Sequence, residues 1–256
     1  MLESHNSDDD PFRSLEQKRA FELILVRVEE AIENGSLKPG DRLPPERELA
    51  EMFGVGRTSL REALRALEMF GVISARRGRG PDSGSFVTQG TQSGLQIALR
   101  LHIGLMRVPT RDIVGIRGVL ESFAAHGAAI AFSGVSTRKL RSLVDAMGNA
   151  EEARIFNELD TEFHVELAQI SNNALLPVLM GSLRSAMKRE MVNSFANLVD
   201  WRSERDRLVV EHGRIIALIE SGDADGAASL AREHVHSFYG KVLGANEHTK
   251  IGVRDT

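Results

Sequence analysis

The chain has 256 residues and a net charge of −4, with 42% hydrophobic and 27% charged residues. This length is typical of two domains of ordinary size, each with its own hydrophobic core. The absence of cysteine excludes disulfides, thiolate metal sites and cysteine nucleophiles, and it fits a reducing compartment.

The N-terminal residues 1–13 predict a disordered tail. The start, MLESHNSDDDP, is acidic and polar and lacks the basic segment and apolar core of a secretory signal. No apolar run in the chain approaches the roughly 18 residues that suggest a membrane span. We therefore expect a cytoplasmic protein with no membrane partner.

Residues 14–88 predict three helices followed by a two-stranded hairpin. Apolar residues at helical spacing indicate the first helix, which the Asn34-Gly35 pair ends. The second helix runs from Pro45 to Gly54, and the third runs from about Arg57 to Phe70 before Gly71. The segments VISARRGRG and GSFVTQ are typical of two short strands. This order predicts a winged helix-turn-helix, whose third helix would enter the DNA major groove.

The third helix has one apolar side and one basic side. Arg57, Arg61 and Arg65 follow each other at four-residue steps, opposite a run of leucines and alanines. In one interpretation these arginines form surface ion pairs with Glu62 and Glu68. However, the stretch from this helix to the hairpin holds six arginines and two glutamates in an acidic chain. We therefore favour binding to DNA phosphates.

The stretch LKPGDRLPPERELAEMFGVGRTSLREALRALEMFGVI, with RRGRG and GSFV after it, resembles the DNA-binding domain of the GntR superfamily of bacterial transcription regulators. The resemblance covers roughly residues 15–88. Two positions depart from the family pattern, because Pro45 and Gly56 stand where serine is common. The resemblance implies that six residues contact DNA: Arg47, Arg57, Thr58, Ser59, Arg61 and Gly78.

A polar linker at residues 89–93 precedes a second domain, residues 94–244, that is almost wholly helical. Short connections between its helices predict an antiparallel bundle, and residues 245–256 form a second tail. The fold class is thus mainly α, a winged helix-turn-helix plus a helical bundle of about seven helices. We place the helices near 94–106, 110–132, 137–149, 152–171, 174–198, 203–220 and 224–242.

One aspartate and three histidines of this domain are candidate metal ligands. Asp160 and His164 lie at i and i+4 on one helix face, while His212 and His234 belong to two later helices. Nitrogen and oxygen ligands suit Zn²⁺, with Ni²⁺ and Mn²⁺ as alternatives. Hydrogen-bonded core histidines would show the same spacing. His236 is turned about 160° from His234 on its helix, so we leave it out.

The Asp-x-x-x-His element, the histidine before the apolar run ending in SGD and the histidine of the last helix are similar to the FCD ligand-binding domain of the FadR-type GntR branch. This resemblance implies that Asp160, His164, His212 and His234 bind a divalent metal, and that Arg117 binds the carboxylate of a small organic acid effector. Gly115 replaces a frequent acidic residue, and Arg117 has an alternative role as the ion-pair partner of Glu121. The implied protein is a homodimeric repressor of a near-palindromic operator, whose DNA affinity the effector changes.

Two alternatives remain open. The first is the same type of regulator with effector binding that needs no metal. The second is a metal-dependent hydrolase on a helical bundle, suggested by the sequence His164-Val-Glu166. The chain lacks the Cys-x-x-Cys element of deaminases and a His-Glu-x-x-His motif, and the glycine-rich GRGPDSG lacks the Lys-Ser/Thr ending of a phosphate loop. We therefore expect no enzymatic activity.

Overall fold

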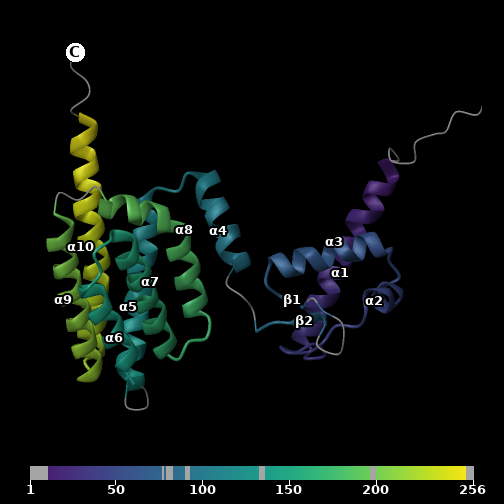
Figure 1. Ribbon diagram of the computed structural model, residues 1–256, viewed down its shortest axis with the longest axis horizontal. Coiled ribbons are helices and arrows are strands. Elements are labelled where there is room, and N and C mark those ends of the chain that lie inside the picture. Colours follow the sequence, from purple (N-terminus) through teal and green to yellow (C-terminus); the bar gives the residue numbers. More distant parts are fainter. Residues whose placement is uncertain are drawn as a thin grey trace, which may run out of the picture. The chain divides into compact units, whose positions relative to one another are not determined.

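The computed structural model describes residues 11–76, 78, 83–89, 93–132, 136–196 and 200–251. It divides into two compact units, Met1–Leu95 and Gln96–Thr256, which we describe separately. The mainly helical fold class is confirmed (Figure 1). The elements in chain order are α1 (Pro11–Glu33), α2 (Glu46–Phe53), α3 (Arg57–Met69), β1 (Ile73–Arg76), β2 (Gly84–Val87), α4 (Ser93–Met106), α5 (Thr110–Ala131), α6 (Arg138–Gly148), α7 (Ala153–Ile170), α8 (Leu176–Ala196), α9 (Trp201–Glu220) and α10 (Ala224–Ile251).

In the first unit, α1, α2 and α3 enclose a small apolar core. Leu60 and Ala63 of α3 are completely buried, and Ile24 of α1 is 1% exposed. Helix α2 ends at Gly54, and the turn after α3 contains Gly71; both glycines have the positive φ of the left-handed region, 65° and 72°. The apolar side of α3 is therefore held by the core, which leaves its other side exposed.

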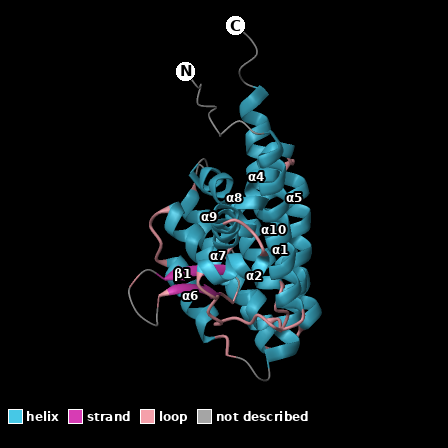
Figure 2. Cartoon of the chain, turned by 90° about the vertical axis from the view of Figure 1, so that its right-hand side faces the viewer, coloured by secondary structure: helices cyan, strands magenta, loops and turns pink. Residues whose placement is uncertain are grey.

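The predicted hairpin is an antiparallel pair of strands, with Ile73 opposite Val87 and Arg76 opposite Gly84 (Figure 2). The sequence analysis missed a third segment, which runs along the free side of β2. Arg42 forms a bridge with Phe86, and the Leu43 amide donates a hydrogen bond of 2.8 Å to the Ser85 carbonyl. These contacts connect the segment before α2 to the wing, the hairpin formed by β1 and β2. Arg77 and Arg79 of the predicted basic wing lie outside the described residues.

The second unit is a helical bundle in which α5 and α10 pack along each other (Figure 1). Small side chains make this close approach possible, because Ala124 and Ala128 of α5 and Ala227 and Ala231 of α10 are completely buried. Helix α7 adds Phe163 to the same core. Side chains that α5, α7 and α10 direct inward therefore converge in the interior of the bundle.

Some predicted boundaries differ from the structure. Helix α1 begins at Pro11, so residues 11–13 of the expected tail are helical. Helix α10 continues to Ile251, so residues 245–251 of the second expected tail are also helical. The segment after residue 244, ANEHTKI, contains no proline or glycine that would end a helix. The division between the two units lies inside α4, which begins at Ser93.

One described helix, α5, is long and apolar enough to cross a membrane by length and composition alone. Half of its apolar window is buried inside the protein. The helix also places Arg117 and Glu121 in the core, where both are almost completely buried. Core helices of soluble proteins have the same length and composition, so these two properties are weak evidence for a membrane span.

Candidate metal centre and nucleic-acid interface

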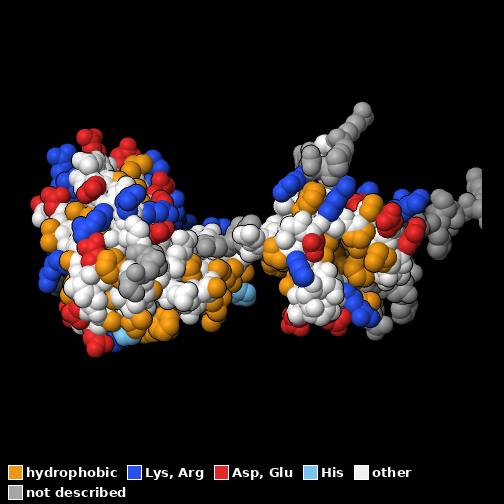
Figure 3. Space-filling view, turned by 90° about the horizontal axis from the view of Figure 1, so that it is seen from below, with side chains coloured by type: hydrophobic (Ala, Val, Ile, Leu, Met, Phe, Trp, Pro, Cys, Tyr) orange, Lys and Arg blue, Asp and Glu red, His pale blue; other side chains and the backbone are white. Residues whose placement is uncertain are grey.

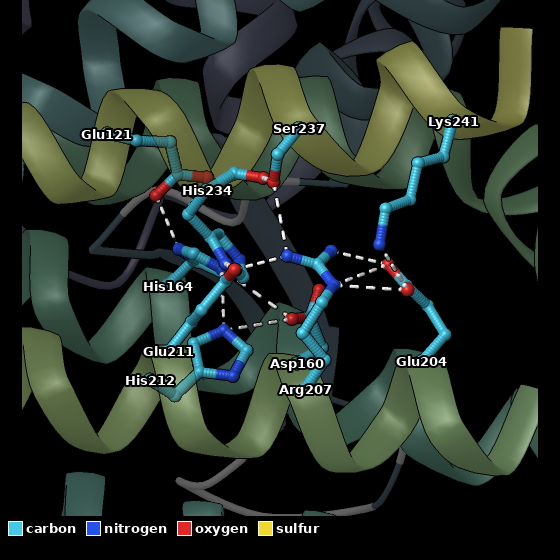
Figure 4. Close-up of polar contacts among 10 residues, drawn as sticks. All are labelled: Glu121, Asp160, His164, Glu204, Arg207, Glu211, His212, His234, Ser237 and Lys241. Carbon is cyan, nitrogen blue, oxygen red and sulfur yellow. Dashed lines mark hydrogen bonds and ion pairs between the residues drawn. The ribbon is translucent and has the colours of Figure 1, made fainter. Parts of the chain in front are cut away.

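The four predicted metal ligands come together in the core of the second unit. Asp160 and His164 of α7, His212 of α9 and His234 of α10 are all buried. Each offers one ligand atom, and these atoms lie within 4.8 Å of one another. Figure 4 shows the three imidazole rings and the carboxylate converging from their helices. Three nitrogens and one carboxylate oxygen are a donor set that Zn²⁺ and neighbouring divalent ions accept.

The contacts inside this cluster bring two ring nitrogens and a carboxylate oxygen close together. His212 Nε2 lies 3.3 Å from His164 Nε2 and 3.2 Å from Asp160 Oδ1. Burial, together with the nearby His234, lowers the pKa of His212 to about 3, and burial also lowers the pKa of His234. These two imidazoles are therefore neutral near pH 7, which is the form that binds a metal. The residues fit a divalent ion.

Two glutamates that the sequence analysis did not propose as site residues contact the histidines from outside the cluster. Glu121 Oε2 lies 2.5 Å from His164 Nδ1, and Glu211 Oε2 lies 2.8 Å from His234 Nδ1. Metal-binding histidines usually have such a carboxylate on their second nitrogen, because it fixes the tautomer and the ring orientation. Each glutamate thus directs the Nε2 atom of its histidine toward the cluster.

Two buried arginines complete the network. Arg184 of α8, missed by the sequence analysis, places Nη1 2.9 Å from Glu121 Oε1 and donates through Nη2 to Asp160 Oδ2. Arg117 places Nη2 3.3 Å from Glu121 and donates a 2.8 Å hydrogen bond to the Tyr239 hydroxyl. Burial alone would raise the pKa of Glu121, but its contact with His164 and the positive charges of Arg184 and Arg117 outweigh burial and hold that pKa well below its usual range. The alternative ion pair of Arg117 with Glu121 is therefore present, in the core.

A small cavity adjoins the cluster. Arg117, Asp160, His234 and Tyr239 line it together with apolar side chains that include Met191. The guanidinium, the carboxylate and the imidazole thus lie along one cavity. Its volume is about 10 Å³, room for about one water molecule, so a ligand of the size of an organic acid would require the lining side chains to move.

The sequence element proposed for a hydrolase does not add to the cluster. Glu166 is bonded to Lys139 at 2.7 Å, on the outer side of α7. His236, excluded on geometric grounds, is exposed, and its Nε2 lies beside Gly118 of α5.

In the first unit, the structure exposes most of the predicted DNA-contacting residues. Arg57, Thr58 and Arg61 lie on the exposed side of α3, and Arg47 of α2 and Gly78 of the wing are also exposed. Ser59 differs, because its side chain is 6% exposed. It precedes the core residue Leu60 and belongs to the side of α3 that packs inward.

The predicted pairs of these arginines with Glu62 and Glu68 are not present among the described contacts. Arg61 Nε instead donates to Glu46 Oε2 of α2 at 2.8 Å, while Glu68 accepts a hydrogen bond from the Ala75 amide. Neither Arg57 nor Arg65 has an ion pair within the described part of the chain. Unpaired guanidinium groups on an exposed helix are suited to anionic partners such as DNA phosphates.

The comparisons with known proteins agree with this division. Residues 22–81 match the model of the gntR family of bacterial regulatory proteins, and residues 112–237 match the FCD domain. The putative HTH-type transcriptional regulator RmpR of Mycobacterium gastri is 30% identical over 88% of this chain and 80% of its own length.

A second relative is the putative L-lactate dehydrogenase operon regulatory protein of Escherichia coli, 29% identical over 85% of this chain and 84% of its own. The solved structure of a GntR protein from Streptococcus agalactiae has the same fold, with a TM-score of 0.57 over 86% of this chain and 98% of its own, at 23% identity. These relatives are transcription regulators rather than enzymes. The chain belongs to the GntR family of DNA-binding transcription regulators and carries an FCD domain.

Proposed function

We propose that this regulator senses a small organic acid through a divalent metal held in its FCD domain, and that the acid changes the affinity of the regulator for its operator. The observation that carries the proposal is the buried cluster of Asp160, His164, His212 and His234 beside the cavity that Arg117 lines. A bound Zn²⁺, or Ni²⁺ or Mn²⁺, would supply a Lewis-acidic centre there. The chain itself supplies the ligands, orients them and excludes bulk water.

The charges of the buried network favour an anionic effector. Arg117 and Arg184 carry two positive charges, which Glu121 and Asp160 balance. A divalent cation bound to three neutral histidines would therefore leave the interior with excess positive charge. A carboxylate offsets that charge, and the Arg117 guanidinium, which lines the cavity, carries N–H donors for it. Because one relative is named for an L-lactate dehydrogenase operon, L-lactate belongs among the first acids to test.

The DNA part of the proposal assigns Arg47, Arg57, Thr58, Arg61 and Gly78 to the operator interface. Arginines at the start of a recognition helix suit both guanine edges and phosphates. Ser59, with its buried side chain, would contribute through its backbone amide at the helix N-terminus.

A cytoplasmic homodimer on a near-palindromic operator is part of the same proposal. GntR regulators are commonly dimers, and two-fold symmetry of the protein matches two half-sites. Support from the chain comes from α5, where Ile116, Val119, Phe123 and Ile130 are more than half exposed along one face. Figure 3 shows hydrophobic side chains exposed on the surface of the helical unit. A second copy of α5 is a fitting partner for such a face.

Metal analysis of the purified protein tests the proposal. We expect one divalent ion per chain in the wild type and in His236→Ala, and loss of the ion in His212→Ala, because only the second variant removes a ligand. The same proteins are then screened by thermal shift against small carboxylic acids, with and without a chelator. Acid binding that survives the chelator would reject the metal in favour of metal-independent sensing, and turnover of any acid or ester would favour the hydrolase.

Two further measurements test the role of Arg117 and the assignment as a repressor. Arg117→Met should weaken binding of the acid while metal content stays unchanged, and equal affinity in both proteins would reject its role. We propose repression that the acid relieves; a reporter gene behind the operator should be silent with the protein and active once the acid is added. A reporter gene that the protein activates would contradict repression, but it would not affect the proposed binding of metal and acid.

A further inference from the structure

Arg184 is one of the largest fully buried side chains of the protein, with 1% of its surface exposed. It lies on α8, which provides none of the four candidate ligands. Its guanidinium bridges two carboxylates of the network, donating through Nη1 to Glu121 Oε1 and through Nη2 to Asp160 Oδ2. Charge balance alone explains why a buried arginine needs acidic partners. It does not explain why one of those partners is a candidate metal ligand.

Asp160 divides its two oxygens between two neighbours. Oδ2 accepts from Arg184, while Oδ1 lies 3.2 Å from His212 Nε2 and 3.6 Å from His164 Nε2. An unrestrained carboxylate binds a cation through one oxygen or through both. Here the second oxygen is already engaged by a donor that cannot be deprotonated in a protein. Only Oδ1 faces the histidine nitrogens.

We propose that Arg184 is a positioning residue that holds Asp160 to a single ligand oxygen and so keeps a coordination position open for an anion. This inference rests on the proposed function, since it concerns the same metal and the same effector. With one oxygen and three nitrogens, the protein supplies four donor atoms. A second oxygen from Asp160 would take a place that the effector needs, on the side where Asp160 and His234 line the cavity.

Arg117 differs from Arg184 in its contacts with Asp160. It is buried to the same degree, carries the same charge and contacts the same Glu121. Its other hydrogen bonds go to Tyr239 and Met191, and within the described chain it makes none to Asp160. Arg117→Met and Arg184→Met therefore each remove one buried positive charge, but only the second frees Asp160 Oδ2.

The test uses Co²⁺ as a visible probe of the site and azide as a small anion that takes one coordination position. Wild type and both methionine variants are loaded with Co²⁺ and titrated with azide, followed by the visible absorption of the metal. We expect each protein to bind one Co²⁺ per chain, and Arg184→Met to bind azide about tenfold or more weakly than wild type. Azide affinity of Arg184→Met equal to that of wild type would overturn the inference, and Arg184→Lys controls for the charge, because Arg117 is itself proposed to contact the bound anion.

Arg184→Lys covers the case in which the methionine variant does not fold. Lysine keeps the positive charge, but its ammonium cannot reproduce the planar fork that spans two carboxylates. Azide binding to Arg184→Lys should be weaker than to wild type, and binding equal to wild type would overturn the positioning role. A wild-type protein that binds no Co²⁺ would instead refute the metal centre of the proposed function. Wild type that binds both Co²⁺ and azide, with azide affinity unchanged in the Arg184 variants, would refute this inference alone.

Discussion

Replacing Glu121 by glutamine should destabilise the helical unit strongly, because this one carboxylate serves three buried partners. It contacts His164 Nδ1 at 2.5 Å, Arg184 Nη1 at 2.9 Å and Arg117 Nη2 at 3.3 Å, and it is completely buried. Glu121→Gln keeps the shape and creates no cavity, so the effect comes from charge. Two buried guanidinium groups would then share the single charge of Asp160.

Removing one partner of a buried ion pair costs about 3 to 5 kcal/mol. With a urea dependence of about 2 kcal/mol per molar, this lowers the unfolding midpoint by roughly 2 M. The single tryptophan, Trp201 on α9, packs against Phe156 and Phe195, all inside the helical unit. Its fluorescence therefore follows the unfolding of that unit alone, in protein freed of metal by a chelator.

Glu158→Gln is the control for this experiment. It removes the same charge from the same unit, but Glu158 lies on the surface and pairs there with Arg154 and Lys188. Surface pairs contribute little to stability, so the control should unfold close to wild type. Equal urea midpoints for Glu121→Gln and Glu158→Gln would refute the reasoning, since the buried network would then add nothing that a surface pair does not.

Three other predictions concern packing, DNA and metal. Gly127→Ala should destabilise the helical unit by roughly 1 to 3 kcal/mol, because the added Cβ would lie 2.9 Å from the Ser171 side chain at the end of α7. Gly115→Ala on the same helix meets nothing within 4 Å and should stabilise the unit by up to about 1 kcal/mol. The reverse order of the two variants in thermal unfolding would contradict this packing. Arg61→Ala should lower the slope of log K against log salt for operator binding by about 0.9 if this side chain contacts one phosphate, and an unchanged slope would remove that contact. Glu211→Gln should weaken metal binding about 10- to 100-fold by freeing the histidine of α10, and unchanged affinity in a chelator competition would exclude an orienting role.

Local sequence signals predicted the winged unit well, because its elements are short and bounded by turn residues. Gly54 and Gly71 mark the ends of α2 and α3 through the left-handed backbone that glycine adopts. The extra segment beside β2 escaped notice, since a single bridge at Arg42 has no alternating pattern. The last helix was predicted to end near residue 242, whereas it continues to Ile251.

In the candidate metal site, the four ligands could be proposed from their positions on predicted helices and from the resemblance to the FCD domain. Their supporting residues could not be proposed in the same way. Arg184 lies in the segment RSAMKRE, where other basic residues are exposed, and only packing shows that it is the buried one. Glu121 appeared only as a neighbour of Arg117 at i+4, while its contact with His164 joins two helices. Contacts between helices depend on how the bundle packs, which periodicity does not encode.

The charged network joins α5, α7, α8, α9 and α10 at one point of the bundle. A ligand bound there adds RT ln(1 + [L]/Kd) to the unfolding free energy, about 2.7 kcal/mol at a concentration of 100 Kd. Under the proposed function, the supply of metal in the cell therefore determines how long each regulator molecule survives proteases as well as how it responds. Starvation for the ion would reduce the number of regulator molecules, and the genes under its control would respond to metal nutrition even when the acid is absent.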